Sequence, residues 1–186
     1  MDSDGYLSQL ADIFNGITVN TPSISAIIAI ALAGVLLLAS GFASASEIAF
    51  FSLSPSDRND IDERNHPSDD KISALLGDTE RLLATILITN NFVNVTIIML
   101  CNFFFMNVFV FHSPLAEFLI LTVILTFLLL LFGEIMPKIY SAQKTLAFCR
   151  FSAPGIYGLE KVFFPIASVL VRSTTFLNKH FAKKNH

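Results

Sequence analysis

The sequence predicts an all-α membrane protein with three transmembrane helices, plus short cytoplasmic and juxtamembrane amphipathic helices. Apolar residues make up 53% of the 186 residues, including 19 Phe, and the mean hydropathy is +0.64. A soluble domain has a much more polar composition. Three apolar stretches each reach the roughly 20 helical residues that cross a hydrocarbon core of about 30 Å. All 12 Lys and Arg residues would lie on one side of this three-span arrangement.

The first span, about Ile24 to Phe51, follows a segment, residues 1–23, that contains no Lys or Arg. A cleavable signal peptide needs a basic start, so we expect the first span to be its own insertion signal. The second span runs from about Leu82 to Phe105 and the third from about Leu115 to Met136. The transmembrane domain is therefore expected over residues 24–147.

The connection from 52 to 81 mixes acidic and basic residues and is predicted to form two short cytoplasmic helices. Ser54-Pro55-Ser56-Asp57 is a typical helix start, with Pro early and an acid in the first turn. Gly77 would end the second helix. A solvated linker whose charges do nothing specific is an equally good interpretation.

A fourth apolar stretch, Phe148 to Val171, is interrupted by prolines, glycines and the charged pair Glu160 and Lys161. Backbone groups freed by proline need partners in lipid, and charges inside the membrane are costly. We therefore expect amphipathic helices at the membrane surface rather than a span, within the final segment 148–186. A basic, unpatterned tail from Asn178 to His186 suits anionic lipid.

The distribution of basic residues predicts the orientation. Residues 1–23 and 103–114 contain none, whereas 52–81 contains four and the chain from Lys138 onward contains eight. Loops rich in Lys and Arg stay in the cytoplasm. The prediction is a multi-pass protein of the cell's inner (plasma) membrane, with the N-terminus outside and the C-terminus in the cytoplasm.

Each span carries polar groups where they are costly. They are Ser40, Ser44, Ser46 and Glu47 in the first span, Asn90, Asn91 and Asn94 in the second, and Glu134, flanked by Gly133 and Pro137, in the third. Spacings of three and four residues place Ser40, Ser44 and Glu47 on one helical face. Asn90 and Asn94 share a face, and Asn91 points about 100° away from them.

The third span combines a carboxylate with a loosened backbone. Gly133 and Pro137 weaken the helical hydrogen bonding beside Glu134, so that a main-chain carbonyl can turn outward. Hydroxyl, amide, carbonyl and carboxylate oxygens favour Mg²⁺, Ca²⁺ or Na⁺ over zinc or copper. Cys101 and Cys149 lack metal-binding spacing and are expected to be packed thiols.

Structural alternatives remain open for these residues. Ser and Asn in spans often form hydrogen bonds between helices, and packing is the favoured role for Ser40 and Ser46. Two interpretations of Glu47 remain equally open. It is either a carboxylate at the cytoplasmic membrane interface or a residue with a role in gating or cation binding.

Three runs on successive spans resemble the transmembrane domain of the CorC/cyclin M (CNNM) family. They are Ser44-Ala45-Ser46-Glu47-Ile48-Ala49, Asn90-Asn91-Phe92-Val93-Asn94 and Phe132-Gly133-Glu134-Ile135-Met136-Pro137-Lys138. The resemblance implies a homodimeric Mg²⁺ transporter that exports Mg²⁺ in exchange for Na⁺. It also implies an ion site of Ser44, Asn90, Asn94, the Gly133 carbonyl and Glu134, with Asn91 as a neighbour.

The chain departs from the family pattern in two places. Thr89 stands where many relatives have Gly, and the CBS modules that usually follow are absent, so we expect this chain to be a piece of a longer protein. Some relatives are named for gliding motility or haemolysis. A non-transporting membrane scaffold in a motility or secretion assembly is therefore the second hypothesis. The sequence contains no HExxH or GxSxG motif and no intramembrane aspartate pair, so no motif predicts an enzyme. No cluster of basic residues predicts nucleic-acid binding.

Overall fold

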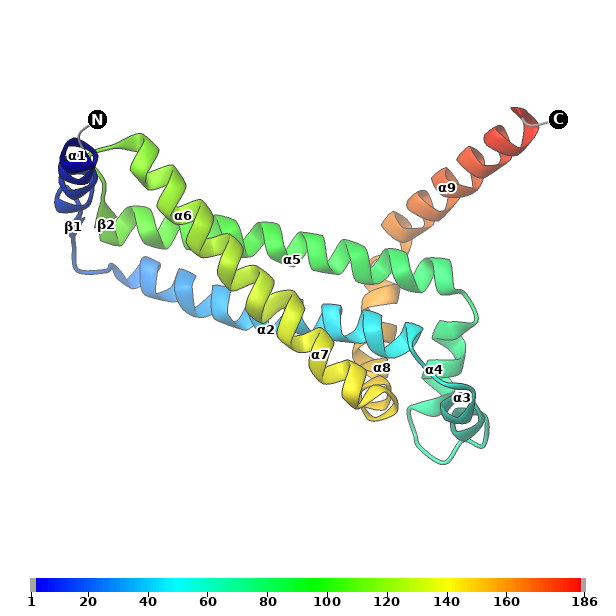
Figure 1. Cartoon of the computed structure of the whole chain (residues 1–186). Helices are drawn as coiled ribbons and strands as arrows, with labels where there is room; N and C mark the ends of the chain where they lie inside the picture. The colour runs from blue at the N-terminus through cyan, green and yellow to red at the C-terminus, as the bar shows by residue number, and fades with distance from the viewer. Residues whose placement is uncertain (1–2, 185–186) are drawn as a thin grey trace.

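The computed structural model describes residues 3–184, and three long antiparallel helices form its body (Figure 1). They are α2 (Ile24–Phe51), α5 (Thr79–Val108) and a composite third helix. The third helix joins α6 (Pro114–Leu128), a π-helical segment η1 (Leu129–Ile135) and α7 (Met136–Gln143). All three are long and apolar enough to cross a membrane. The predicted fold class is confirmed. Residues 1–2 of the predicted segment 1–23 and residues 185–186 of the predicted segment 148–186 lie outside the described range.

The second and third helices are longer than the predicted spans. They contain 30 residues each, and the first contains 28. Capping side chains explain their starts, because Asp78 accepts the N–H of Arg81 and Ser113 accepts that of Ala116. Both helices therefore begin in polar sequence just outside the apolar stretch.

A short sheet closes the end of the bundle near the N-terminus. Helix α1 (Ser3–Asn15) leads into β1 (Thr18–Val19), which pairs antiparallel with β2 (Phe109–Val110). Asn20 N–H donates to the Val108 carbonyl at 2.6 Å. These contacts, which the sequence did not predict, join the start of α2 to the end of α5.

The opposite end of the bundle carries α3 (Pro55–Asp62) and α4 (Asp69–Leu76). Ser54 and Asp57 form the reciprocal capping box that the sequence predicted, and Gly77 follows α4 as its C-cap. Ile72 and Leu75 are buried in a core with Phe50 of α2. The connection is therefore packed, and the solvated-linker interpretation is wrong.

The last two helices are longer than expected. α8 (Thr145–Val162) crosses the end of the bundle, and α9 (Phe164–Lys184) projects from it after a bend of 79° (Figure 1). The break falls at Phe163 rather than at Pro154, which lies inside α8. Residues 178–184 belong to α9, so the expectation of an unpatterned tail is wrong there. By length and composition alone, the bent pair could be counted as a fourth, broken span.

Two apolar cores hold these elements together. The first joins α2, α3, α4, α5 and α8 around Phe50, Leu82 and Ile156. The second lies between the three long helices and contains Ala33, Val93, Ile97, Cys101 and Leu125. The polar residues predicted to form the site lie along the helices between these two cores.

Candidate functional site

The centre of the site is a contact between α2 and α5. Ser40 Oγ lies 2.9 Å from Asn90 Oδ1 and 2.7 Å from Asn94 Oδ1. Ser40 is fully buried and both asparagines are half-buried. The four-residue spacing of the asparagines places both amides on the α5 face that meets α2.

This contact brings three oxygen atoms together around one hydroxyl hydrogen. A serine hydroxyl has one proton to donate, whereas each amide oxygen accepts. Ser40 therefore cannot give a full hydrogen bond to both asparagines at once. When several oxygen atoms lie close together and have too few hydrogen-bond donors, they form an environment that suits a cation.

Ser44 extends the same face by one turn. Its side chain is 0% exposed, and its Oγ has no hydrogen-bond partner among the described residues. A buried hydroxyl without a partner costs about 1–3 kcal/mol, so its presence requires an explanation. Ser46, by contrast, donates to the Phe42 carbonyl of its own helix at 2.7 Å.

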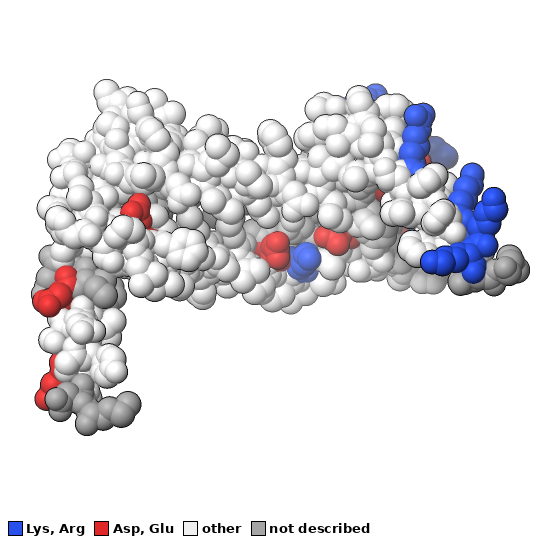
Figure 2. Space-filling view, turned by 90° about the horizontal axis from the view of Figure 1, so that it is seen from above, with Lys and Arg blue, Asp and Glu red and all other residues white. Residues whose placement is uncertain are grey.

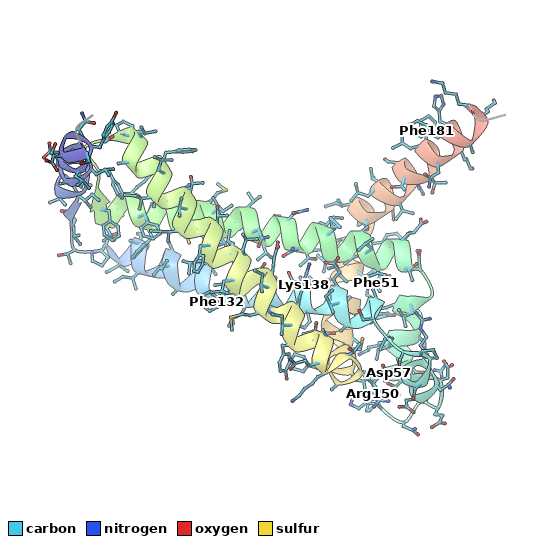
Figure 3. The ribbon with its side chains drawn as sticks, viewed as in Figure 1. Phe51, Asp57, Phe132, Lys138, Arg150 and Phe181 are labelled. Atoms are coloured by element: carbon cyan, nitrogen blue, oxygen red, sulfur yellow. The ribbon has the colours of Figure 1, made fainter. Side chains whose placement is uncertain are left out.

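Glycines bring the third helix against α2. A Cβ built on Gly133 would lie 3.2 Å from Ser40 Oγ, and one built on Gly41 would lie 3.0 Å from Pro137 Cγ. Figure 3 labels Phe132 and Lys138, which lie on this part of the third helix. Gly133 therefore lies beside the Ser40 cluster, as a shared site requires.

The backbone of the third helix is irregular at the same place. Met136 N–H donates to the Leu131 carbonyl, five residues back, as in a π-helix. Pro137 has no N–H, so it cannot serve the Phe132 carbonyl in the π pattern or the Gly133 carbonyl in the α pattern. Pro137 therefore removes one backbone donor from the turn that contains Glu134.

The remaining predicted residues have different surroundings. Glu134 is half-buried, while Asn91 is exposed on α5, away from the Ser40 contact. Glu47 faces Lys138 across α2 and α7, with 3.9 Å between Oε2 and Nζ. In this structure Glu47 therefore forms an ion pair with Lys138, which offsets its charge.

The donors around Ser40 are the kind that hard cations prefer. Within residues 3–184, no group of three or more His, Cys, Asp or Glu side chains lies close enough to hold a metal ion. The cluster instead consists of hydroxyl and amide oxygens near one carboxylate. This donor set excludes the thiolate and imidazole chemistry of a zinc site.

Comparison with known proteins agrees with the motifs and with the three-span architecture. The cyclin M transmembrane N-terminal domain matches residues 30–186. The chain belongs to the CNNM family. A UPF0053 protein from Haemophilus influenzae is 30% identical over 132 residues, which are 71% of this CNNM chain and 30% of that relative. This CNNM chain thus matches less than a third of the relative's length.

The structural role expected for Ser40 is confirmed, because its hydroxyl contacts both asparagines of the neighbouring helix. The sequence did not identify these partners. Only the register between α2 and α5 brings Asn90 and Asn94 to Ser40.

Proposed function

We propose that this chain transports a divalent cation, Mg²⁺, across the membrane through an oxygen-ligand site shared by its three spans. The ligands would be Ser44, Asn90, Asn94, the Gly133 carbonyl and Glu134. The observation that carries the proposal is that the amide oxygens of Asn90 and Asn94 lie 2.9 and 2.7 Å from the hydroxyl oxygen of Ser40. Mg²⁺ prefers such oxygens and usually retains several of its waters.

A single carboxylate suits transport better than permanent binding. Glu134 would supply the negative charge, and the neutral oxygens would replace part of the hydration shell. A site with more carboxylates would hold the ion too tightly to release it. Export in exchange for Na⁺ is part of the proposal and rests on the family resemblance.

The proposed orientation has the N-terminus outside and the C-terminus in the cytoplasm, in the plasma membrane. Figure 2 shows most of the visible Lys and Arg at the end of the molecule that carries α9, with a basic residue also near the middle, while the α1 end shows Asp and Glu but no Lys or Arg. This charge separation supports the orientation, because basic segments are retained in the cytoplasm.

A homodimer is also proposed. Only 33%, 33% and 17% of the apolar windows of the three spans are buried inside one protomer. Symmetric pairing is the commonest way to cover such surface around a polar site. A single mass equal to one protomer in both mild detergent and nanodiscs would contradict it.

The main alternative is a membrane scaffold that transports nothing. The contacts of Ser40 with both asparagines also support the scaffold, because bonds between helices fix the helices in position. In that case the polar cluster contributes to stability only, and Mg²⁺ has no effect on it.

Thermal unfolding with and without Mg²⁺ separates the two functions. Ligand that binds only the folded protein raises its stability. We expect Mg²⁺ to raise the melting temperature of the wild-type chain and to leave that of Glu134→Gln almost unchanged. Asn94→Ala and Ser44→Ala each remove one neutral ligand and should weaken binding by about tenfold to a hundredfold, equivalent to about 1–3 kcal/mol.

Ser46→Ala is the matched control, because its hydroxyl bonds within its own helix. Its Mg²⁺ response should equal that of the wild type. A full Mg²⁺ response in Glu134→Gln would disprove the proposed site. No response in any variant, including the wild type, would favour the scaffold.

A further inference from the structure

A cleft of about 410 Å³ lies between α5 and α6, on the β1–β2 side of the Ser40 cluster. Its wall on α5 includes Ile98 and Asn102, and its other wall runs along α6 from Pro114 to Leu129, the first residue of η1. At 1.5 Å per residue, the α6 wall is about 22 Å long. The cleft therefore extends through much of the membrane thickness on this side.

The position of the cleft is continuous with the proposed cation site. Ile98 follows Asn94 by one helical turn, and Leu129 precedes Gly133 by one turn, because α5 and the third helix run in opposite directions. The inner end of the cleft is therefore one turn from the cluster. Ile98 and Leu129, which bound this last turn, are apolar, and Leu129 packs against the core that contains Leu125.

Four polar side chains line the cleft: Asn102 on α5, and Glu117, Thr122 and Thr126 on α6. Lipid tails cannot hydrogen-bond to an amide or solvate a carboxylate, so polar residues at this depth normally face protein or water. The chain has no Lys or Arg between Arg81 and Lys138, which leaves Glu117 as the charged group of the cleft. The lining is mostly apolar, but its polar groups include one carboxylate and no basic residue, which suits a hydrated cation.

We infer that this cleft is a water-filled vestibule through which the cation reaches or leaves the site from the β1–β2 side. The inference rests on the proposed cation site. Glu117 attracts the hydrated ion at the mouth, and Asn102, Thr122 and Thr126 replace hydrogen bonds of its outer water shell along the wall. Ile98 and Leu129 form the apolar constriction between the vestibule and the site.

Cysteine accessibility in nanodiscs tests the vestibule. The background is the full chain with Cys101→Ala and Cys149→Ala, and single cysteines replace Thr122 or Thr126. The matched controls are Val123 and Phe127, which are one residue further along α6 and 65% and 62% exposed, but do not line the cleft. Only an ionised thiol reacts quickly with a charged methanethiosulfonate, and thiols ionise in water rather than in lipid.

We expect the cysteines at 122 and 126 to react at least about tenfold faster than those at 123 and 127, since a lipid environment suppresses the thiolate. A cationic reagent should react faster than an anionic one at both cleft positions. Glu117→Gln should remove that preference without slowing the anionic reagent. Equal rates at 126 and 127 would overturn the inference and indicate that lipid or protein fills the cleft.

The Mg²⁺ thermal shift is measured on the same cysteine variants before labelling, so the two proposals fail separately. A normal Mg²⁺ shift with unreactive cleft cysteines contradicts the vestibule alone. Reactive cleft cysteines without any Mg²⁺ shift contradict the proposed cation site and leave a water-filled cleft of another purpose, which also overturns the cation route.

Discussion

At the residue scale, the hydroxyl of Ser40 determines how α2 and α5 meet. It contacts two amide oxygens on the neighbouring helix, whereas Ser46 contacts only a carbonyl of its own helix. Both serines are fully buried, so their exposure does not distinguish them. What distinguishes them is whether the partner belongs to another helix.

This difference predicts unequal effects of two identical substitutions. Ser40→Ala leaves two amide oxygens without their donor and should lower the free energy of unfolding by about 1–3 kcal/mol in metal-free buffer. Ser46→Ala should cost less than about 1 kcal/mol, since only a bond within one helix is lost. Unfolding in detergent with increasing denaturant measures both. Similar losses for the two variants would contradict the assigned role of Ser40.

Glu160 on α8 gives a pH-dependent prediction. Its Oε2 is buried without a hydrogen-bond partner among the described residues. Burial raises the pKa of its carboxyl above the ordinary 4.5, Asp78 adds to this, and Arg81 opposes it. The folded chain therefore holds the proton more tightly than the unfolded chain, and this stabilisation is lost as pH rises through the folded pKa.

Glu160→Gln removes the charge that burial disfavours. We expect it to raise the melting temperature at pH 7, and we expect the gain to shrink as the pH falls toward 4.5. The exposed Glu80 in the first turn of α5 supplies the control substitution, Glu80→Gln. A gain that does not vary with pH would show that ionisation is not its cause.

At the element scale, two glycines set how closely the third helix approaches α2. Gly41 faces Pro137 and Gly133 faces Ser40, at distances that leave little room for a methyl group. The contact lies beside the π-helical turn, where the backbone already departs from α-helical hydrogen bonding. Close approach and an irregular backbone therefore occur together beside the Ser40 cluster.

Gly41→Ala should therefore destabilise the chain by about 1–3 kcal/mol through overpacking. It should also weaken the Mg²⁺ response, because the third helix would be pushed away from Ser40. Gly34→Ala, on the same helix, is the control, since a Cβ there meets nothing within 4 Å. If thermal unfolding gives equal stability for the two variants, close packing is not what Gly41 provides.

Much of this architecture follows from sequence patterns that have a direct physical cause. The three apolar stretches, the Ser54 capping box and the irregular backbone near Pro137 were all predictable, because each depends on neighbouring residues alone. The pairing of β1 with β2 was not, since two residues per strand carry no detectable alternation. The partners of Ser40 were not predictable either, because they depend on the register between two helices.

The extent of α9 was missed for a different reason. Its basic residues after Asn178 were interpreted as a tail, since no apolar stretch continued beyond Val171. Phe181 nevertheless follows Leu177 by four residues, which is a helical spacing. A short, sparse apolar pattern of this kind is difficult to separate from coil without the structure.

At the scale of the whole molecule, the proposed orientation can be tested with single cysteines in intact cells. In a background without Cys101 and Cys149, a cysteine at Ser3 should react with an impermeant thiol reagent. One at Asn65, between α3 and α4, should not. Asn65 is the better reporter of that connection because it is exposed, whereas the nearby Ser68 is 7% exposed and reacts poorly on either side. The reverse labelling pattern would contradict the orientation.

The ion pair between Asp69 and Arg150 also links distant parts of the chain. Arg150 Nε donates to Asp69 Oδ1 at 3.0 Å, and the Asp69 side chain is 0% exposed. Figure 3 labels Arg150 near Asp57, at the end of the bundle where α8 meets α3 and α4. The two partners are 81 residues apart in sequence.

This separation has a consequence for how the chain is made. At about 5–20 residues per second, a ribosome needs roughly 4–16 s to synthesise Arg150 after Asp69. During that time the carboxylate has no guanidinium, and the apolar faces of α4 have no α8 to cover them. The connection between the first two spans is therefore completed only after α8, one of the last helices, has been made. A nascent chain arrested after the third span would expose the uncovered surface of α4 to chaperones and proteases.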